Sequence, residues 1–129
     1  MASSGYILIV EDDDDIREAL TQILELEGYV VREAANGREA LDISCREPTP
    51  SLILLDLMMP VMDGWQFRAE QMKDPNLSKV PVVVISADAS VHEKVATFGA
   101  ASVLPKPISL DRLLRAVESL YPPPRQSLP

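Results

Sequence analysis

Five short apolar runs, spaced along the chain, constrain its fold more than any other feature. They occupy residues 7–10, 29–31, 52–55, 82–85 and 103–104, and the second is the weakest. Within the strong runs the apolar residues are continuous and do not alternate with polar ones. Continuous runs are typical of strands in a parallel sheet, because helices then cover both faces of the sheet. We therefore expect a buried parallel sheet.

Amphipathic segments lie between these runs and predict helices. In the first segment five apolar residues share one helical face. They are Ile16, Ala19, Leu20, Ile23 and Leu24. Three expected helices begin with capping boxes, at the pairs Asn36–Glu39, Asp63–Gln66 and Ser90–Glu93. Ser109 is expected to cap the last helix, and Gly28 and Gly99 stand where helices should end.

The order of elements is therefore a strand followed by a helix, repeated five times. Right-handed crossovers wind such a chain into an α/β three-layer sandwich with helices on both faces of the sheet. A chain of 129 residues has room for one domain of this kind. We expect a short leader at residues 1–5, the domain at residues 6–121, and a proline-rich tail or linker stump at residues 122–129.

Charge and apolar content exclude several classes of protein. A net charge of −8 argues against non-specific binding to nucleic acid, which requires a basic surface. No N-terminal signal peptide is visible, and no apolar run approaches the roughly 20 residues that span a bilayer. We therefore expect a cytoplasmic protein that contacts neither nucleic acid nor membrane.

Several conspicuous side chains are interpreted without a chemical role. Cys45 is the only cysteine, so no disulfide can form within the chain, and we place it on the buried face of the second helix. Trp65, Ala69 and Met72 follow helical spacing and are expected to pack inside. His92 is interpreted as an exposed histidine in the first turn of a helix.

Polar residues follow the strands at the points where the strands end. They are Glu11 and Asp12 after the first strand, Asp56 after the third, Ser86 (followed by Ala87) after the fourth, and Lys106 after the fifth. Taken singly, each has an ordinary interpretation as a surface residue, and the acids at 13–15 read as a helix cap and first turn. In a parallel sheet, however, the carboxyl ends of the strands share one edge, where ligands bind. We therefore expect these side chains to converge.

The chemistry of this set points to phosphoryl transfer. Two carboxylates about 4 Å apart repel by roughly 4 kcal/mol at an effective dielectric constant of 20, so the acids need compensation. Mg²⁺ binds carboxylate, water and phosphate oxygens. Lys106 can serve as a point charge for a phosphoryl group and Ser86 as a hydrogen-bond donor to it. A carboxylate such as Asp56 can be the nucleophile that forms an aspartyl phosphate.

At these residues the chain resembles the receiver domain of two-component response regulators. The resemblance covers about residues 6–121 and rests on four segments in the right order, ILIVEDDDDIREAL, LILLDLMMPVMDGWQF, VVVISAD and LPKPI. It implies a (βα)5 flavodoxin-like fold of the CheY type, with the parallel strands in the order 2-1-3-4-5. It also implies a phosphorylation-dependent signalling switch and not an enzyme acting on other substrates.

The resemblance assigns roles around the phosphoryl group. Asp56 is expected to be the phosphoacceptor, with Lys106 paired to the group that it accepts. The hydroxyl of Ser86 and the backbone of Ala87 and Leu57 are expected to hold phosphoryl oxygens. These five residues form the expected reaction centre.

The same resemblance implies a Mg²⁺ site. Asp12 would bind the ion directly, and Glu11 would act mainly through a water molecule. The backbone carbonyl of Met58 and the carboxylate of Asp56 would complete the protein's ligands. The acids leave two registers open, Glu11 with Asp12 or Asp12 with Asp13. The family places its pair directly after the first strand, which favours the former.

Further expectations concern the loops around the site. The resemblance implies a cis peptide between Lys106 and Pro107, which proline permits, and a loop shaped by Pro60 and Gly64. Val103 stands where the family often has a tyrosine or phenylalanine. A valine has no large ring to bury or expose, so coupling through a ring flip is not expected to work in the usual way.

The expected partners are a histidine kinase or phosphotransfer protein and a downstream target or effector domain. A homodimer through the fourth and fifth helices is a further option. Met58 is apolar and cannot orient an attacking water, so slow self-dephosphorylation is expected.

Two other functions are less well supported by the sequence. An aspartate-nucleophile phosphatase needs a second aspartate where Met58 stands, and phosphorylation-independent docking modules usually lack an acid or the lysine, all of which this chain has.

Overall fold

A computed structural model describes residues 5–46, 48–88 and 99–123. Within these residues the chain forms five strands, four α-helices and one 3-10 helix. In order they are β1 (Ile7–Val10), α1 (Asp14–Leu26), β2 (Val31–Ala34), α2 (Gly37–Arg46), β3 (Leu52–Asp56), α3 (Gly64–Lys73), the 3-10 helix η1 (Leu77–Lys79), β4 (Val82–Ser86), β5 (Ser102–Pro105) and α5 (Leu110–Leu120). The helix expected to begin near Ser90, and with it His92, lies outside the described residues.

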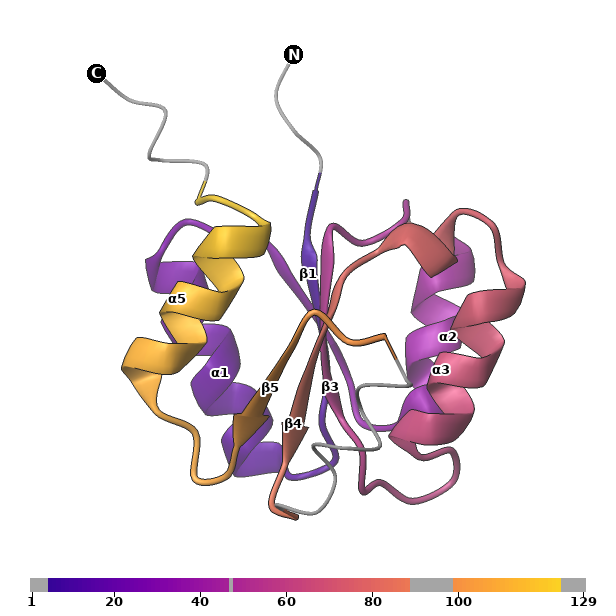
Figure 1. Cartoon of the computed structure of the whole chain (residues 1–129), viewed down its shortest axis with the longest axis horizontal. Coiled ribbons are helices and arrows are strands. Elements are labelled where there is room, and N and C mark those ends of the chain that lie inside the picture. The colour runs from indigo at the N-terminus through magenta and orange to yellow at the C-terminus, as the bar shows by residue number, and fades with distance from the viewer. Residues whose placement is uncertain (1–4, 47, 89–98, 124–129) are drawn as a thin grey trace.

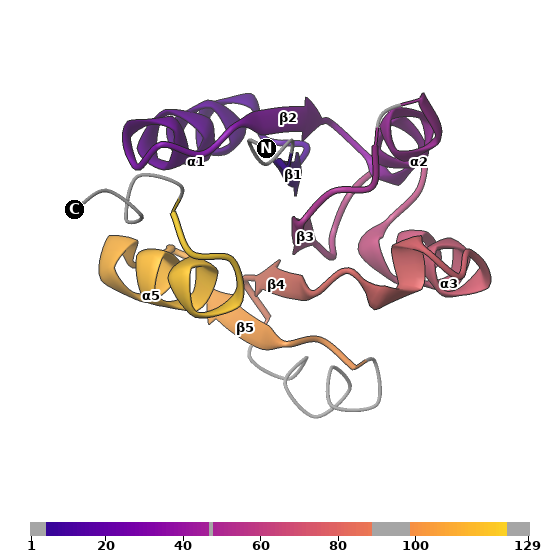
Figure 2. The same cartoon turned by 90° about the horizontal axis from the view of Figure 1, so that it is seen from above.

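The five strands form one parallel sheet in the order β2-β1-β3-β4-β5, which confirms the predicted fold class. Helices α1 and α5 cover one face of the sheet, and α2 and α3 cover the other (Figures 1 and 2). Every pair of neighbouring strands is parallel, so the carboxyl ends of all five strands lie at one edge.

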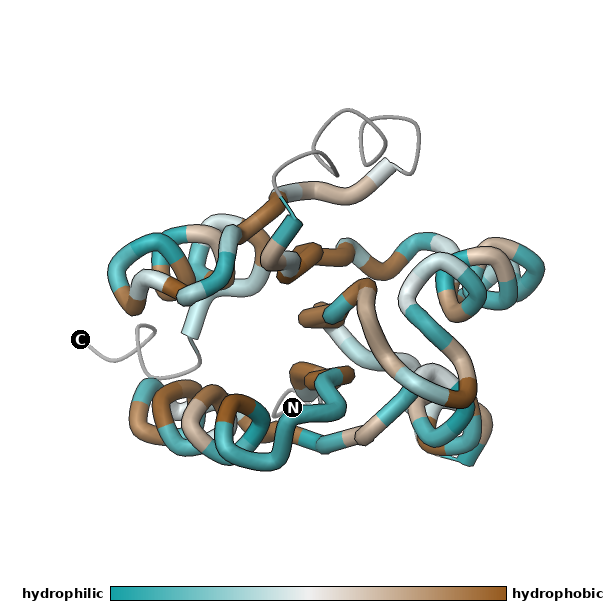
Figure 3. The backbone as a smooth tube through the Cα atoms, turned by 90° about the horizontal axis from the view of Figure 1, so that it is seen from below, coloured by the Kyte–Doolittle hydropathy of each residue, from teal (hydrophilic) through white to brown (hydrophobic). Residues whose placement is uncertain are grey.

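The core has two parts, one on each face of the sheet. All residues of β1, β3 and β4 are buried, as continuous apolar runs predict. Leu20, Leu24, Leu113 and Val117 complete the part under α1 and α5, and Ala40 and Phe67 belong to the part under α2 and α3. Apolar segments therefore lie inside and hydrophilic ones on the outer turns of the helices (Figure 3).

The helix ends follow the capping signals. Asp63 and Gln66 form a reciprocal capping box at the start of α3. Asn36 accepts the N–H of Glu39 at 3.0 Å, and Ser109 accepts the N–H of Arg112 at 3.3 Å. Gly28 and Gly99 adopt φ angles of 99° and 81°, in the left-handed region that glycine tolerates. At Gly28 this conformation follows the end of α1.

Two packing predictions are wrong. Cys45 is exposed, because α2 turns Gly37 and Ala40 toward the core and carries Cys45 in its last turn outside that face. In α3 the buried residues are at positions 64, 67 and 71, so Met72 is 53% exposed and Ala69 is also exposed, while Trp65 packs only partly against the core. Within the described residues, no helix has both the length and the apolar content needed to cross a bilayer.

Candidate functional site

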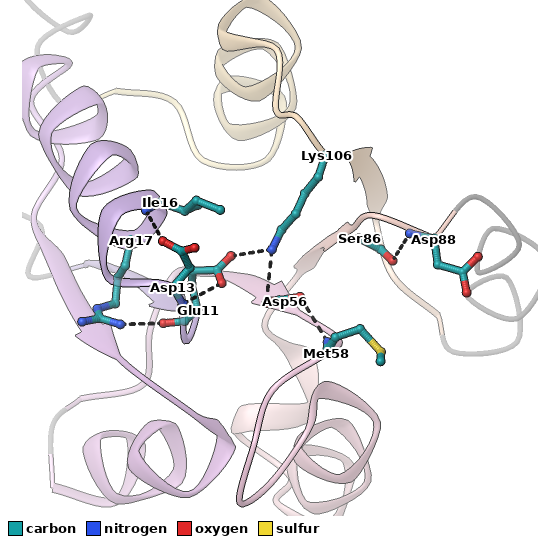
Figure 4. Close-up of polar contacts among 9 residues, drawn as sticks. All are labelled: Glu11, Asp13, Ile16, Arg17, Asp56, Met58, Ser86, Asp88 and Lys106. Carbon is teal, nitrogen blue, oxygen red and sulfur yellow. Dashed lines mark hydrogen bonds and ion pairs between the residues drawn. The ribbon is translucent and has the colours of Figure 1, made fainter.

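The strand ends bring the predicted side chains to one edge of the sheet. Glu11 directly follows β1, Asp56 ends β3, Ser86 ends β4, and Lys106 directly follows β5. Figure 4 shows the Lys106 side chain reaching from the end of β5 toward Glu11 and Asp56. The convergence expected from a parallel sheet is therefore present.

Asp56 is a buried carboxylate with few but specific contacts. It is 2% exposed, and its Oδ1 accepts the backbone N–H of Met58 at 3.1 Å. Its Oδ2 lies 3.4 Å from Nζ of Lys106. The start of α3 packs directly against this backbone, since a Cβ placed on Gly64 would lie 2.8 Å from the carbonyl oxygen of Asp56. Glycine therefore lets the loop after Asp56 fold back on the strand.

Glu11 is fully buried, and one of its two carboxylate oxygens is poorly satisfied. Its Oε2 accepts the backbone N–H of Asp13 at 3.1 Å. Its Oε1 forms an ion pair with Nζ of Lys106 at 3.2 Å, yet among the described residues it has no hydrogen-bond partner. A buried anionic oxygen without a hydrogen bond is costly. It therefore favours a further positive group at this point.

Glu11, Asp12 and Asp56 form a cluster of carboxylates. One oxygen of each lies within 4.8 Å of the others, with Asp12 exposed and the other two buried. A set made only of oxygen donors suits a hard divalent cation such as Mg²⁺. Asp13 is instead the N-cap of α1 and accepts the N–H of Ile16 at 3.0 Å. Because the carboxylate of Asp13 is engaged in capping α1, the structure favours the register in which Glu11 and Asp12 form the acidic pair.

The pKa values of two groups in the site, Asp56 and Lys106, are shifted from their ordinary values. Burial raises the pKa of Asp56 to about 7, and the neighbouring Glu11 adds to the rise, while the Met58 N–H and Lys106 oppose it. Burial alone would lower the pKa of Lys106, but the carboxyls of Asp56 and Glu11 outweigh it and raise that pKa. Lys106 therefore stays protonated at neutral pH. Perturbed carboxyl groups of this kind are common at functional sites.

Ser86 and its neighbours line the other side of the site. Ser86 is 3% exposed, and its Oγ accepts the N–H of Asp88 at 3.1 Å. The hydroxyl acts as acceptor in this bond, so its own hydrogen can be directed at an incoming oxygen. The carbonyl of Ser86 accepts the N–H of Lys106 at 3.0 Å, which ties β4 to the residue after β5. Ala87 is exposed.

The loop after Asp56 also holds the two remaining predicted residues. The N–H of Leu57 donates to the carbonyl of Ile85 at 3.4 Å, so it is engaged with β4, and its own carbonyl accepts the N–H of Gly64 at 3.0 Å. The Met58 side chain is 68% exposed beside the site. The phosphoryl-binding role of Leu57 and the metal-binding role of the Met58 carbonyl stay predictions.

The remaining loop predictions concern the peptide between Lys106 and Pro107 and the position of Val103. The peptide between Lys106 and Pro107 is cis, as predicted. Val103 is partly buried and packs against the core under α2 and α3. Sequence reasoning missed Arg17, whose Nη1 donates to the carbonyl of Glu11 at 2.8 Å. The available signal was an arginine one turn into the helix that follows a run of five acids.

Comparisons with known proteins agree with this geometry. A family model described as the response regulator receiver domain matches residues 7–118. The response regulator MprA of Mycolicibacterium vanbaalenii is 40% identical over 116 residues, which are 88% of this chain and 49% of that protein. MprA of Mycobacterium bovis is 39% identical over 119 residues. The chain thus spans about half the length of the curated relatives that it matches.

Solved structures match over nearly the whole chain. The chemotaxis protein CheY4 of Vibrio cholerae superposes with a TM-score of 0.83 and 28% identity, covering 92% of this chain and 99% of that one. A response regulator receiver protein from Pseudomonas putida gives a TM-score of 0.84 at 26% identity, with the same coverage.

Proposed function

Because the chain belongs to the response regulator receiver domain family, we propose that it is a phosphorylation-dependent switch whose phosphoacceptor is Asp56. The observation that carries the proposal is the position of Lys106, whose ammonium lies 3.4 Å from Asp56 and 3.2 Å from Glu11. A lysine held there by two carboxylates is placed to bind an anionic group that arrives at Asp56.

The reaction is a phosphoryl transfer from a phosphohistidine of a kinase or phosphotransfer protein. An oxygen of the Asp56 carboxylate attacks phosphorus, the new P–O bond forms, and the P–N bond to the donor histidine breaks. The histidine keeps the electron pair of that bond and takes up a proton. Lys106 and the hydroxyl of Ser86 bind the transferred phosphoryl oxygens. The backbone N–H groups of Ala87 and Leu57 add donors, that of Leu57 by exchanging its 3.4 Å bond to the Ile85 carbonyl for a phosphoryl oxygen.

A divalent cation fits the donors present. Asp12, Asp56, the Met58 carbonyl and, through water, Glu11 would hold Mg²⁺, and the oxygen of Glu11 that lacks a hydrogen bond supports this assignment. When bound, Mg²⁺ supplies positive charge that stabilises the anionic oxygens during transfer. The chain's own residues provide the nucleophile and the orientation.

The output is a change in affinity for a downstream target or effector domain. Moving a two-state equilibrium from one extreme to the other requires differential binding of about 5 kcal/mol. Contacts of the phosphoryl group with Lys106 and Ser86 in the active state can provide much of that difference. A homodimer through α5 and the helix expected before β5 is also proposed, and the second of these elements lies outside the described residues.

The test uses a small-molecule donor. The chain is incubated with acetyl phosphate and Mg²⁺, and intact mass spectrometry measures the addition of one phosphoryl group. We expect the wild type and Asp42→Asn, an exposed carboxylate on α2, to be modified, and Asp56→Asn to remain unmodified. Tight Mg²⁺-dependent binding of beryllofluoride that is lost in Asp56→Asn is the second expected result. Modification of Asp56→Asn would contradict the proposal, because the acceptor would then be another residue. No binding of beryllofluoride by the wild type would contradict it in favour of a docking module.

A further inference from the structure

Arg17, in the first half of α1, contacts the acidic loop that carries the candidate cation ligands. Its Nη1 donates to the backbone carbonyl of Glu11 at 2.8 Å (Figure 4). Its Nη2 pairs with Oδ1 of Asp14 at 2.5 Å. The Arg17 side chain is only 17% exposed, whereas that of Asp14 is 86% exposed. The guanidinium is therefore held against the loop and is not displayed to solvent.

The carbonyl that Arg17 binds, that of Glu11, lies where β1 passes into the acidic loop. The N–H of Glu11 still pairs with Ala34 of β2 at 3.0 Å, so the strand ladder reaches this residue. The Glu11 carbonyl belongs to the next peptide group, which leads to Asp12. Beyond it, the loop is held by Asp13, which caps α1 and donates its N–H to Glu11. The bond from Arg17 therefore fixes the peptide group between Glu11 and Asp12, which carries the exposed Asp12.

We propose that Arg17 is a positioning residue for the cation site. By binding the carbonyl of Glu11, it fixes the peptide between Glu11 and Asp12 and so presents the Asp12 carboxylate beside Glu11 and Asp56. Arg17 acts through this backbone group and is not a ligand. The inference rests on the proposed function in one respect, that the site binds Mg²⁺.

Positioning and simple electrostatics predict opposite effects when Arg17 is removed. A positive group near the site repels a divalent cation, so the loss of its charge alone should strengthen Mg²⁺ binding. Groups that orient metal ligands act the other way, and their loss typically weakens metal binding by 10- to 100-fold. Lysine keeps the charge but lacks the planar fork that lets arginine bind the carbonyl and Asp14 together. The two substitutions therefore separate charge from geometry.

The experiment is a calorimetric titration of the chain with Mg²⁺. We compare the wild type with Arg17→Met and Arg17→Lys. The control is Arg115→Met, which also removes one positive charge but lies on α5, where Arg115 is 80% exposed and pairs with Asp111. We expect about tenfold weaker binding for Arg17→Met and weaker binding than the wild type for Arg17→Lys. Arg115→Met should bind as the wild type does or slightly more tightly. Circular dichroism without Mg²⁺ checks that each variant is folded.

Two results would overturn the inference while leaving the proposed function intact. One is that Arg17→Met binds Mg²⁺ as tightly as the wild type or more tightly. The other is that Arg17→Lys binds as the wild type does, since charge alone would then suffice. If Arg17→Met does not fold, the comparison of Arg17→Lys with the wild type decides. Failure of the wild type itself to bind Mg²⁺ would contradict both the proposed function and this inference.

Discussion

The ammonium of Lys106 lies 3.4 Å from Oδ2 of Asp56, so the residue after β5 neutralises a buried carboxylate at the end of β3. The Asp56 side chain is 3% exposed and that of Lys106 is 22% exposed. An ion pair shielded in this way differs from a surface pair, because removal of Lys106 leaves the carboxylate of Asp56 buried and uncompensated. The pair therefore links the stability of the domain to its candidate site.

Replacement of Lys106 by methionine should destabilise the protein in the absence of Mg²⁺. We expect a loss of about 2–3 kcal/mol in the free energy of unfolding at pH 7.5, measured by urea denaturation. The matched control is Lys73→Met on α3, whose partner Glu70 is 44% exposed and which is itself 71% exposed. A surface pair of this kind contributes about 0.5 kcal/mol or less. Equal losses for the two variants would contradict the prediction.

The stability of the protein should depend on pH through Asp56. Burial raises the pKa of this carboxyl from 3.8 to about 7, so the folded chain holds the proton more tightly than the unfolded chain. The resulting stabilisation is complete below pH 3.8 and is lost as the pH rises through 7. The loss amounts to about 1.4 kcal/mol for each unit of the shift.

Asp56→Asn tests this dependence, because asparagine does not titrate. Without Mg²⁺ we expect Asp56→Asn to be more stable than the wild type at pH 8, with the difference shrinking toward pH 4. Urea denaturation across this range measures it. Asp42→Asn removes an exposed carboxylate from α2 and should follow the wild type. A constant difference between Asp56→Asn and the wild type at every pH would show that Asp56 has an ordinary pKa.

Gly64 should not tolerate alanine, although it begins a helix. Helix propensity alone predicts that Gly64→Ala stabilises the protein by about 1 kcal/mol. The new Cβ, however, would lie 2.7 Å from the Cα of Leu57 and 2.8 Å from the carbonyl oxygen of Asp56, and neither backbone atom can move freely. We therefore expect a loss of about 1–3 kcal/mol in thermal or urea unfolding. A stabilised Gly64→Ala variant would disprove this close packing.

Much of this architecture could be predicted from the sequence, for identifiable reasons. Continuous apolar runs indicate strands buried on both faces, and a parallel arrangement of strands then places Glu11, Asp56, Ser86 and Lys106 at one edge. The capping signal at Asp63 was equally informative, because a capping box depends only on residues three apart.

The errors concern the orientation of helices relative to the sheet. Periodicity shows that a helix has an apolar face, but tertiary contacts decide which of two neighbouring faces is buried. In α3 the contact of Gly64 with the Asp56 backbone turns Phe67 and Gln71 inward, and Met72 outward. Arg17 was missed for a related reason. Its position after five acids suggests that it lies near them, but the residue pattern does not show that its partner is the backbone carbonyl of Glu11.

Val61 adopts a backbone conformation that its side chain disfavours. Its φ angle is 68°, in the left-handed region where a β-branched residue is strained, and its side chain is 81% exposed. Val61→Asn should relieve this strain without loss of packing and stabilise the protein by about 1 kcal/mol in urea denaturation. Val30, which is 52% exposed, has no positive φ angle and serves as the control. Val30→Asn should not stabilise the protein, and an equal gain at both positions would exclude strain as the cause.

Met58 should slow the loss of the phosphoryl group proposed to form on Asp56. Its backbone N–H donates to Oδ1 of Asp56, so its side chain departs from a point close to the reacting carboxylate, and that side chain is 68% exposed. Hydrolysis requires a water aligned with phosphorus, and a thioether cannot orient one by a strong hydrogen bond. We therefore expect Met58 to stand beside the proposed acyl phosphate without assisting attack.

Met58→Asn introduces an amide that can align this water. We expect it to shorten the lifetime of the phosphorylated chain about tenfold, which corresponds to about 1.4 kcal/mol in the barrier to hydrolysis. The lifetime is measured by intact mass spectrometry after removal of acetyl phosphate. Met72→Asn makes the same chemical change on α3, where the side chain is 53% exposed, and should leave the lifetime unchanged. An unchanged or longer lifetime for Met58→Asn would mean that access of water, and not its orientation, limits hydrolysis.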